Sequence, residues 1–330
     1  MPNNLVFFGK LTIFWRLSMN NSSNKSTAIR DSVTQRLRNK SQELSLDYNT
    51  LLSRYFFDEF LKLLAKSEYK NNFVLKGGML LSFVLGIDNR STQDIDFLIN
   101  GLKMEDSYLF NVIKSVTAYD ENHDGMWFEI NDSIDSIRPE DEYGGYRFHI
   151  IGHLDKIRFP FSVDIATGDP MYPEVKVGKY STVLGDDIDL QMYPLESVLA
   201  EKLQTILSKA ESNTRSKDFY DIYAIMNSLN ASNNGNCGVA IAYLTDCEFV
   251  NQINESIDFS VLKVAMSLTC KHRNTYFSKV KAREILECIS CDSAVIDRWN
   301  RYAKKHQYAK SVNFEDVISA ILKLINLMLD

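Results

Sequence analysis

Two aspartates placed one residue apart in an apolar strand pattern, shortly after a glycine pair, constrain this chain more than any other feature. Residues 75–99 read LKGGMLLSFVLGIDNRSTQDIDFLI, with Gly77 and Gly78 near the start and Asp94 and Asp96 near the end. Successive side chains of a strand alternate between its faces, so both carboxylates lie on one face and the apolar residues around them can enter the core. Because two adjacent like charges repel, the pattern indicates either a solvated strand end or a cation between the carboxylates.

A third carboxylate, Asp164, lies in a second strand pattern, RFPFSVDIATG, on the face opposite to its apolar neighbours. Oxygen ligands of this kind suit Mg²⁺ or Mn²⁺, ions that usually share their coordination sphere with substrate phosphates. Three carboxylates, two from one strand and one from a neighbouring strand, are the donor set that a two-metal phosphoryl-transfer site requires. The sequence therefore predicts a metal–phosphate site that contains Asp94, Asp96 and Asp164.

The glycine pair ends one strand pattern and begins a helix pattern, MLLSFVLGI. Without side chains at Gly77 and Gly78, backbone N–H groups can approach an anion, and a helix N-terminus favours negative charge. The pair is consistent with a phosphate-binding turn or with an ordinary tight turn.

The order of patterns along the chain predicts an α/β fold followed by helices. Residues 48–66 have apolar positions at helical spacing, which indicates a helix that faces the core. Strand patterns follow at NNFVLKGG, DIDFLIN, YRFHIIGHL and FSVDIATG, and the segment through DDIDLQMYP is expected to be a connection. We predict a mixed sheet with flanking helices over 25–193 and an all-helical C-terminal lobe over 194–330. Residues 1–24 are expected to be a disordered or misannotated extension, with Met19 as the physiological start.

Length and composition exclude several classes of protein. A chain of 330 residues with 45% apolar content can bury the core of two domains. Its apolar runs fall short of the roughly 18 to 20 residues that span a bilayer, which predicts a soluble protein without membrane contact. The five cysteines include one C-x-x-C pair, Cys288 and Cys291, without a second ligand pair. We expect structural or incidental thiols in a reducing cytoplasm rather than a zinc site.

Charge is unevenly distributed although the net charge is only −6. Residues 101–145 contain eleven Asp and Glu against three Lys and Arg, whereas residues 261–310 contain eleven Lys and Arg against four Asp and Glu. The basic segment is either a solvated face or a surface that meets a polyanion.

The combined motifs resemble a known superfamily. A strand that ends in Gly-Gly, a helix, a D-x-D strand and a third strand carboxylate are similar to the nucleotidyltransferases, which transfer a nucleoside monophosphate from an NTP. More narrowly, residues 25–230 resemble the AbiEii/AbiGii family, the toxin halves of type IV abortive-infection systems that defend against phage, in the segments FVLKGGMLL, RSTQDIDFLI, VDIATGDP, YPLESVLAEKLQTI and RSKDFYDIY. The resemblance implies a nucleotidyltransferase-fold sheet and NTP-dependent modification of an acceptor, with tRNA the expected one.

The resemblance also implies roles for ten residues. The metal ligands would be Asp94, Asp96 and Asp164, joined in catalysis by Lys202 and Asp218. The residues that hold the nucleotide would be Gly77, Gly78, Lys202, Thr205, Arg215 and Lys217. The chain departs from the pattern in the long interval between Gly78 and Asp94, in Gly-Gly instead of Gly-Ser, and in short spacings around Thr205. Without the resemblance, Lys202 and Glu201 read as an exposed helix pair, and Arg90 and Thr92 either bind phosphate or anchor the strand entry.

Several partners follow from the same resemblance. We expect Mg²⁺ or Mn²⁺ as cofactor, an NTP as substrate, and a cognate antitoxin, a winged-helix repressor that acts without a stable complex. One alternative is an NTP-binding regulatory protein without transfer activity, against which the three intact acids argue. Another is a nucleotidyltransferase that acts on a protein or small molecule, whereas the basic segment 261–310 favours RNA.

Overall fold

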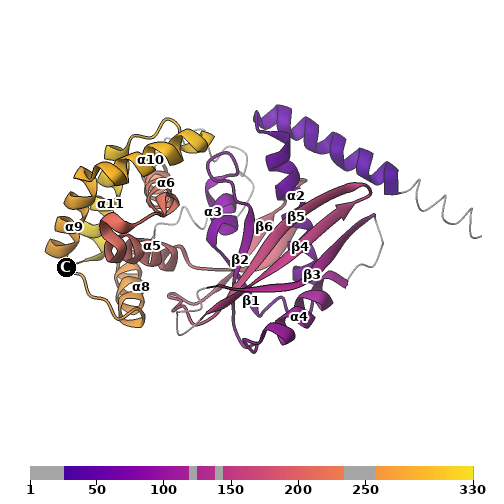
Figure 1. Ribbon diagram of the computed structural model, residues 1–330, viewed down its shortest axis with the longest axis horizontal. Coiled ribbons are helices and arrows are strands. Elements are labelled where there is room, and N and C mark those ends of the chain that lie inside the picture. Colours follow the sequence, from indigo (N-terminus) through magenta and orange to yellow (C-terminus); the bar gives the residue numbers. More distant parts are fainter. Residues whose placement is uncertain (1–25, 119–124, 138–143, 234–256, 330) are drawn as a thin grey trace, which may run out of the picture.

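The computed structural model describes residues 26–118, 125–137, 144–233 and 257–329 (Figure 1). The predictions for residues 1–24, including Met19 as the start, lie outside the described residues. A seven-stranded sheet is followed by helices at the C-terminal side of the chain, as predicted. The boundary between residues 193 and 194 stays a prediction, and one apolar core contains residues from both sides of it, including Leu75 and Leu203.

The sheet is mixed, with the strand order β3-β4-β5-β2-β1-β7-β6. Its central strands, β2 and β5, run parallel, whereas β1 pairs antiparallel with β2 and parallel with β7. The strands are β1 (Phe73–Lys76), β2 (Asp94–Ile99), β3 (Met126–Ile137), β4 (Gly145–Leu154), β5 (Ile157–Ala166), β6 (Lys176–Ser181) and β7 (Asp187–Met192).

Helices flank the sheet and then form the second half of the described chain (Figure 1). Residues 26–44 are helical and precede α2 (Tyr48–Lys66), α3 (Gly77–Leu85) and α4 (Asp106–Ala118). After the sheet come α5 (Leu195–Lys209), α6 (Ser216–Asn233), α8 (Phe259–His272), α9 (Lys279–Cys291), α10 (Ser293–Lys305) and α11 (Phe314–Met328). No helix among the described residues combines the length and the apolar character that crossing a bilayer requires.

The helix α2 forms where its apolar spacing predicts. Asp47 caps its first turn by accepting a hydrogen bond from the N–H of Thr50 at 3.1 Å. Its buried aromatic residues pack on the sheet, for example Phe60 on Phe97 of β2 with ring centroids 6.5 Å apart. Because Phe97 faces α2, the alternation of β2 places Asp94 and Asp96 on the opposite face of the sheet.

Two regions differ from the sequence expectation. The segment through DDIDLQMYP is not a connection, because it contains the strand β7, which pairs with β1 and β6. Its outward-facing Asp187 and Asp189 mask the alternation of the more buried Ile188, Leu190 and Met192. The acidic segment 101–145 likewise holds α4 and the edge strand β3, for which the sequence pattern gave no prediction.

Candidate active site

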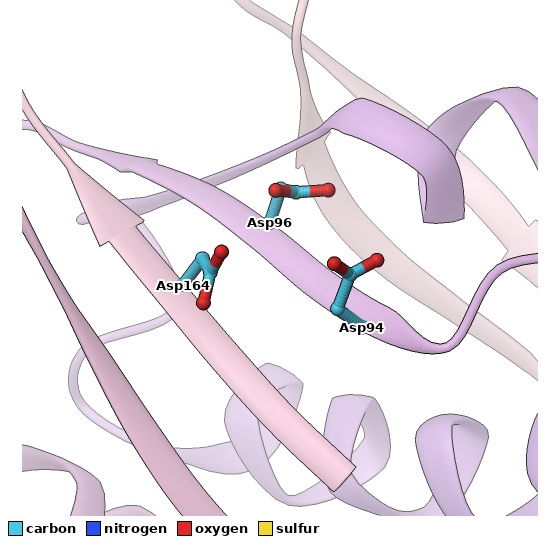
Figure 2. A group of neighbouring side chains, drawn as sticks. All are labelled: Asp94, Asp96 and Asp164. Carbon is cyan, nitrogen blue, oxygen red and sulfur yellow. The ribbon is translucent and has the colours of Figure 1, made fainter. Parts of the chain in front are cut away.

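Three carboxylates meet at the centre of the sheet, as the sequence predicts (Figure 2). Asp94 and Asp96 come from β2 and Asp164 from β5, where Asp96 and Asp164 are direct partners in the parallel register. One oxygen of each carboxylate lies within 4.8 Å of the others. This all-oxygen set fits a hard divalent cation such as Mg²⁺ or Mn²⁺. The cysteines Cys288 and Cys291 are free and exposed, and neither belongs to a metal-ligating group of the described residues.

Neighbouring polar groups fix the two carboxylates of β2. The hydroxyl of Thr92 donates a hydrogen bond to Oδ1 of Asp94 at 2.8 Å. The backbone N–H of Gly78, at the start of α3, donates to Oδ2 of Asp96 at 3.2 Å. The turn between β1 and α3 therefore holds a metal-ligand candidate directly.

The close approach of this turn requires glycine at residue 77. Gly77 has a φ of +63°, in the left-handed region. A Cβ atom at Gly77 would lie 2.0 Å from Oδ2 of Asp96, and one at Gly78 would lie 2.5 Å from Oγ1 of Thr92. Both glycines therefore belong to the carboxylate site by geometry.

An arginine that was not predicted from the sequence forms an ion pair with the third carboxylate. Arg147 on β4 is the register partner of Asp164 and donates from Nε to Oδ1 and from Nη2 to Oδ2, both at 2.7 Å. The bidentate hydrogen bonds raise the pKa of Arg147, and the guanidinium offsets part of the negative charge of the cluster. Its side chain is 37% exposed, so the ion pair lies partly in solvent.

The cluster is under electrostatic stress at neutral pH. Burial, followed by the charges of Asp94 and Asp164, raises the pKa of Asp96 to about 6. The ammonium of Lys217 and the N–H of Gly78 oppose this shift without cancelling it. A bound cation would relieve the repulsion, which is why carboxylates arranged in this way favour metal binding.

This stress gives a measurable pH dependence of stability in metal-free protein. Between the ordinary pKa near 3.8 and the folded-state value of about 6, the folded chain holds a proton on Asp96 that the unfolded chain lacks. At pH 7.5, Asp96→Asn is expected to have the larger free energy of unfolding, by on the order of 2 kcal/mol. Lowering the pH to 4 should raise the free energy of unfolding of the wild type and so reduce this difference. Urea unfolding in EDTA at several pH values measures this difference. A gap between the two proteins that does not change with pH would contradict it.

A cavity of about 740 Å³ extends from Asp96 to the helices that follow the sheet. Glycines 77 and 78 line it together with residues of α5 and α6. Cationic side chains outnumber carboxylates in its lining, with Lys76, Arg90, Lys202, Lys209, Arg215, Lys217 and Arg273 against Asp96, Asp169, Glu201 and Asp218. A cavity with this surplus of positive charge suits a polyanionic ligand.

Lys202 lies inside this cavity and is not half of an exposed pair. Its side chain is 15% exposed, and its Nζ donates to Asp218 at 2.8 Å and to Asp221 at 2.7 Å. Burial by itself lowers the pKa of Lys202, but the two carboxylates outweigh that effect and raise it. Asp221 is fully buried and also accepts a hydrogen bond from Arg90 at 2.7 Å. Arg90 also lines the cavity.

The RSKD segment, residues 215–218, lies at the same wall. Asp218 is buried beside Lys202, and Arg215 approaches it at 3.2 Å. Burial alone raises the pKa of Asp218, but Lys202 and Arg215 overcome this effect and lower it. Lys217 is exposed at the cavity and forms no ion pair with the described residues. Its charge nevertheless acts on Asp96, so the cavity links it to the carboxylate centre.

Thr205 also lines the cavity, where it contacts Arg273, a residue far from it in the sequence. Its hydroxyl donates to the carbonyl of Glu201 at 2.8 Å and accepts a hydrogen bond from Arg273 at 3.0 Å. Arg273 follows α8 and lines the cavity, although it belongs to the basic segment 261–310, which the sequence predicts to be a solvated face or a polyanion-binding surface.

A second ion-pair group at the cavity was also missed. Lys76 precedes the glycine pair and contacts Asp169 at 2.7 Å and Glu201 at 3.5 Å. The hydroxyl of Tyr193 donates to Glu201, and the Lys76 ammonium lies 4.7 Å from the Tyr193 ring centroid. The one sequence feature that could have indicated this group is the charge of Lys76 at the end of an otherwise apolar strand.

Comparison with known proteins adds a family to this geometry. A family profile described as "Nucleotidyl transferase AbiEii toxin, Type IV TA system" matches residues 59–320. The chain belongs to the AbiEii family. Comparison with curated protein sequences gives no match.

Two solved structures from Helicobacter pylori resemble this AbiEii protein. A proposed nucleotidyltransferase is 15% identical, with a TM-score of 0.48 and coverage of 86% of this chain and 96% of the other. JHP933 is 18% identical, with a TM-score of 0.37 and coverage of 81% and 100%.

Membership of the AbiEii family confirms the predicted resemblance and enzyme class. The protein is a nucleotidyltransferase of a type IV toxin–antitoxin system, which implies an NTP substrate and a cognate antitoxin. The matched residues 59–320 include all ten of the predicted site residues. The individual roles of those residues stay predictions.

Proposed function

We propose that this AbiEii toxin transfers a nucleoside monophosphate from an NTP to RNA in a metal-dependent reaction, with tRNA as the acceptor. The observation that carries the proposal is the carboxylate cluster at the end of a cavity with a surplus of positive charge. Asp94, Asp96 and Asp164 would hold Mg²⁺ or Mn²⁺. When bound, the metal neutralises phosphate charge and lowers the pKa of the attacking hydroxyl.

The reaction replaces a phosphoanhydride bond of the NTP by a phosphodiester bond to the acceptor. The acceptor hydroxyl oxygen forms a bond to the α-phosphorus, its proton leaves to solvent, and the bond from the α-phosphorus to the bridging oxygen breaks to release pyrophosphate. Positive charge from Lys202, Arg215 and Lys217 along the cavity would stabilise the negative charge that develops on the leaving group. The N-terminus of α3 at Gly77 and Gly78 would add its dipole at the same place.

Incubation of the purified protein with each labelled NTP, Mg²⁺ and total cellular RNA tests the proposal. We expect label in RNA of tRNA size with at least one NTP, and loss of that label in EDTA. Label found in a protein or a small molecule would overturn the RNA acceptor. Binding of NTP without transfer to any acceptor would instead favour the regulatory alternative.

The proposed RNA acceptor makes a second prediction about the basic segment. Lys271, Lys281 and Arg283 are exposed and do not line the cavity. Their joint replacement by glutamate should weaken tRNA binding about tenfold or more and make its salt dependence shallower, because each lost phosphate contact removes about 0.7 from the log–log slope for single strands. NTP affinity should change less than about twofold, since no charge of the cavity is altered.

A matched control keeps the same change of net charge. Lys70, Lys103 and Lys114 are exposed residues of the N-terminal half, and their joint replacement by glutamate should leave tRNA binding close to wild type. Filter binding or fluorescence anisotropy at several salt concentrations provides the measurement. Equal losses in both triple variants would show a general charge effect rather than a binding surface.

The predicted antitoxin is part of the same proposal. We infer that the toxin's counterpart is a winged-helix repressor that acts without a stable complex with it. Co-purification of the two expressed proteins tests this inference, and a stable complex through size-exclusion chromatography would overturn it.

A further inference from the structure

Most cations of the cavity are matched by carboxylates at close range. Lys76 contacts Asp169 at 2.7 Å, Arg90 contacts Asp221 at 2.7 Å, and Lys202 lies between two acids. In each of these pairs, the carboxylate offsets part of the positive charge. A cation that is fixed in the wall without such neutralisation would be the natural place for an anionic group to bind.

Arg273 is held mainly by neutral groups. Its Nη1 donates to Oε1 of Gln204 at 2.7 Å and to the hydroxyl of Thr205 at 3.0 Å, and both acceptors are neutral. The nearest carboxylate oxygen, on Glu201, is 3.8 Å from Nη2, beyond hydrogen-bond distance. Glu201 is also shared with Lys76 and Tyr193. Arg273 therefore forms one long ion pair, with a carboxylate that it shares with Lys76, and among the described residues its hydrogen bonds go to neutral acceptors.

Buried polar residues build this position. Gln204 is 3% exposed and Thr205 is 8% exposed, and a buried amide is costly unless it is hydrogen bonded. Besides accepting from Arg273, Gln204 donates from Nε2 to the hydroxyl of Thr275 at 3.2 Å. The N–H of Thr275 in turn bonds to the carbonyl of Cys270 at 2.8 Å. One glutamine thus fixes both the guanidinium and the chain just after α8.

The location of Arg273 relates it to the carboxylate centre. Lys76 pairs with Asp96 across β1 and β2 and contacts Glu201, which places Glu201 near the centre. Thr205 lies one turn of α5 farther along, about 5.4 Å by helix geometry. Arg273 therefore meets the cavity one turn beyond the place where the reacting phosphate would lie.

We propose that Arg273 binds the terminal phosphate of the NTP, with Gln204 and Thr205 as its positioning residues. The inference rests on the proposed function, which places the α-phosphate at the carboxylates. A guanidinium presents parallel N–H donors that match two oxygens of one phosphate. Because Nη1 is already engaged, Nη2 and Nε of Arg273 are the donors available for that contact.

Calorimetric titration with Mg²⁺–NTP and with the matching Mg²⁺–NMP tests the assignment. Arg273→Gln should weaken NTP binding roughly tenfold to a hundredfold, the size expected for lost hydrogen bonds to a charged group. The loss of affinity should be similar for every NTP that binds, whatever its base, and the affinity for NMP should stay unchanged. Arg273→Lys should fall between, since it keeps the charge without the fork. Lys103→Gln, an exposed cation outside the cavity and outside the basic segment, is the control and should bind NTP as wild type.

Other results would overturn the assignment. Equal losses for NTP and NMP, or losses that depend on the base, would place Arg273 at the nucleoside. Unchanged NTP binding with weakened tRNA binding would place it at the acceptor, and wild-type behaviour throughout would make it structural. If Arg273→Gln does not fold, Gln204→Glu provides the test, because it places a carboxylate on the guanidinium and should weaken NTP binding in the same selective way.

The two proposals fail in different ways. If Asp96→Asn abolishes transfer while Arg273→Gln binds NTP as tightly as wild type, only the assignment of Arg273 is wrong. If the wild type transfers nothing but Arg273→Gln loses NTP affinity selectively, the transfer reaction is wrong and the phosphate contact is supported. A wild type that binds no NTP overturns both.

Discussion

Replacement of Asp96 by asparagine should reduce nucleotide transfer by about two to four orders of magnitude while the protein stays folded. The substitution keeps the size and shape of the side chain but removes one ligand charge. A neutral amide cannot replace the several kcal/mol of charge stabilisation that a bound metal supplies, and each 1.36 kcal/mol corresponds to about a factor of ten in rate. Transfer of labelled NTP to RNA at fixed Mg²⁺ concentration gives the ratio of rates.

Three further measurements accompany that result. The metal-free variant should melt no lower than wild type, because the repulsion with Asp94 and Asp164 is relieved. The shift of melting temperature on adding Mg²⁺–NTP should shrink, and expression in a bacterial host should become harmless. Asp189→Asn, on the exposed side of β7, is the control and should behave as wild type. A folded Asp96→Asn protein that transfers nucleotide at a comparable rate would refute the metal-site assignment.

Replacement of Gly77 by alanine should damage the same site from the backbone side. The new Cβ would lie 2.0 Å from Oδ2 and 2.5 Å from Cγ of Asp96, so either the carboxylate or the turn has to move. The left-handed backbone adds roughly 1–2 kcal/mol of strain. We expect a loss of about 2–4 kcal/mol in the free energy of unfolding and a fall in transfer of about a hundredfold or more, because small displacements of catalytic groups are costly.

Gly185 offers a matched control for this prediction. It also has a positive φ, +92°, but a Cβ there would meet nothing within 4 Å. Gly185→Ala should therefore show the backbone strain alone, with transfer within about twofold of wild type. Urea unfolding and the transfer assay on both variants separate strain from collision. If the two alanine variants lose stability and activity equally, the contact with Asp96 has no part in the effect.

The carboxylate site was predictable because its signal is local. The alternation of a strand places Asp94 and Asp96 on one face from the sequence alone, and the same argument places Asp164 on the polar side of its own strand. That the two strands are neighbours was inferred from the donor set that a two-metal site requires, and the parallel register of Asp96 with Asp164 makes it a structural fact.

The partners of the carboxylates were not predictable in the same way. Arg147 reaches Asp164 only because β4 and β5 form an antiparallel pair with that register. Arg273 is 68 residues from Thr205 in the sequence and meets it through the packing of α8 on α5. The strand β7 was missed for a different reason, since its outward aspartates disguise a half-buried alternation as a polar loop.

The buried carboxylate of Asp221 has a consequence for how substrate enters. It bonds both to Arg90, just before β2, and to Lys202 on α5, and so joins the sheet side of the cavity to the helical side. Separating the two sides would leave uncompensated buried charges, at a cost of about 3–5 kcal/mol. The cavity is thus preorganised, and a nucleotide that enters it spends little binding energy on ordering its walls.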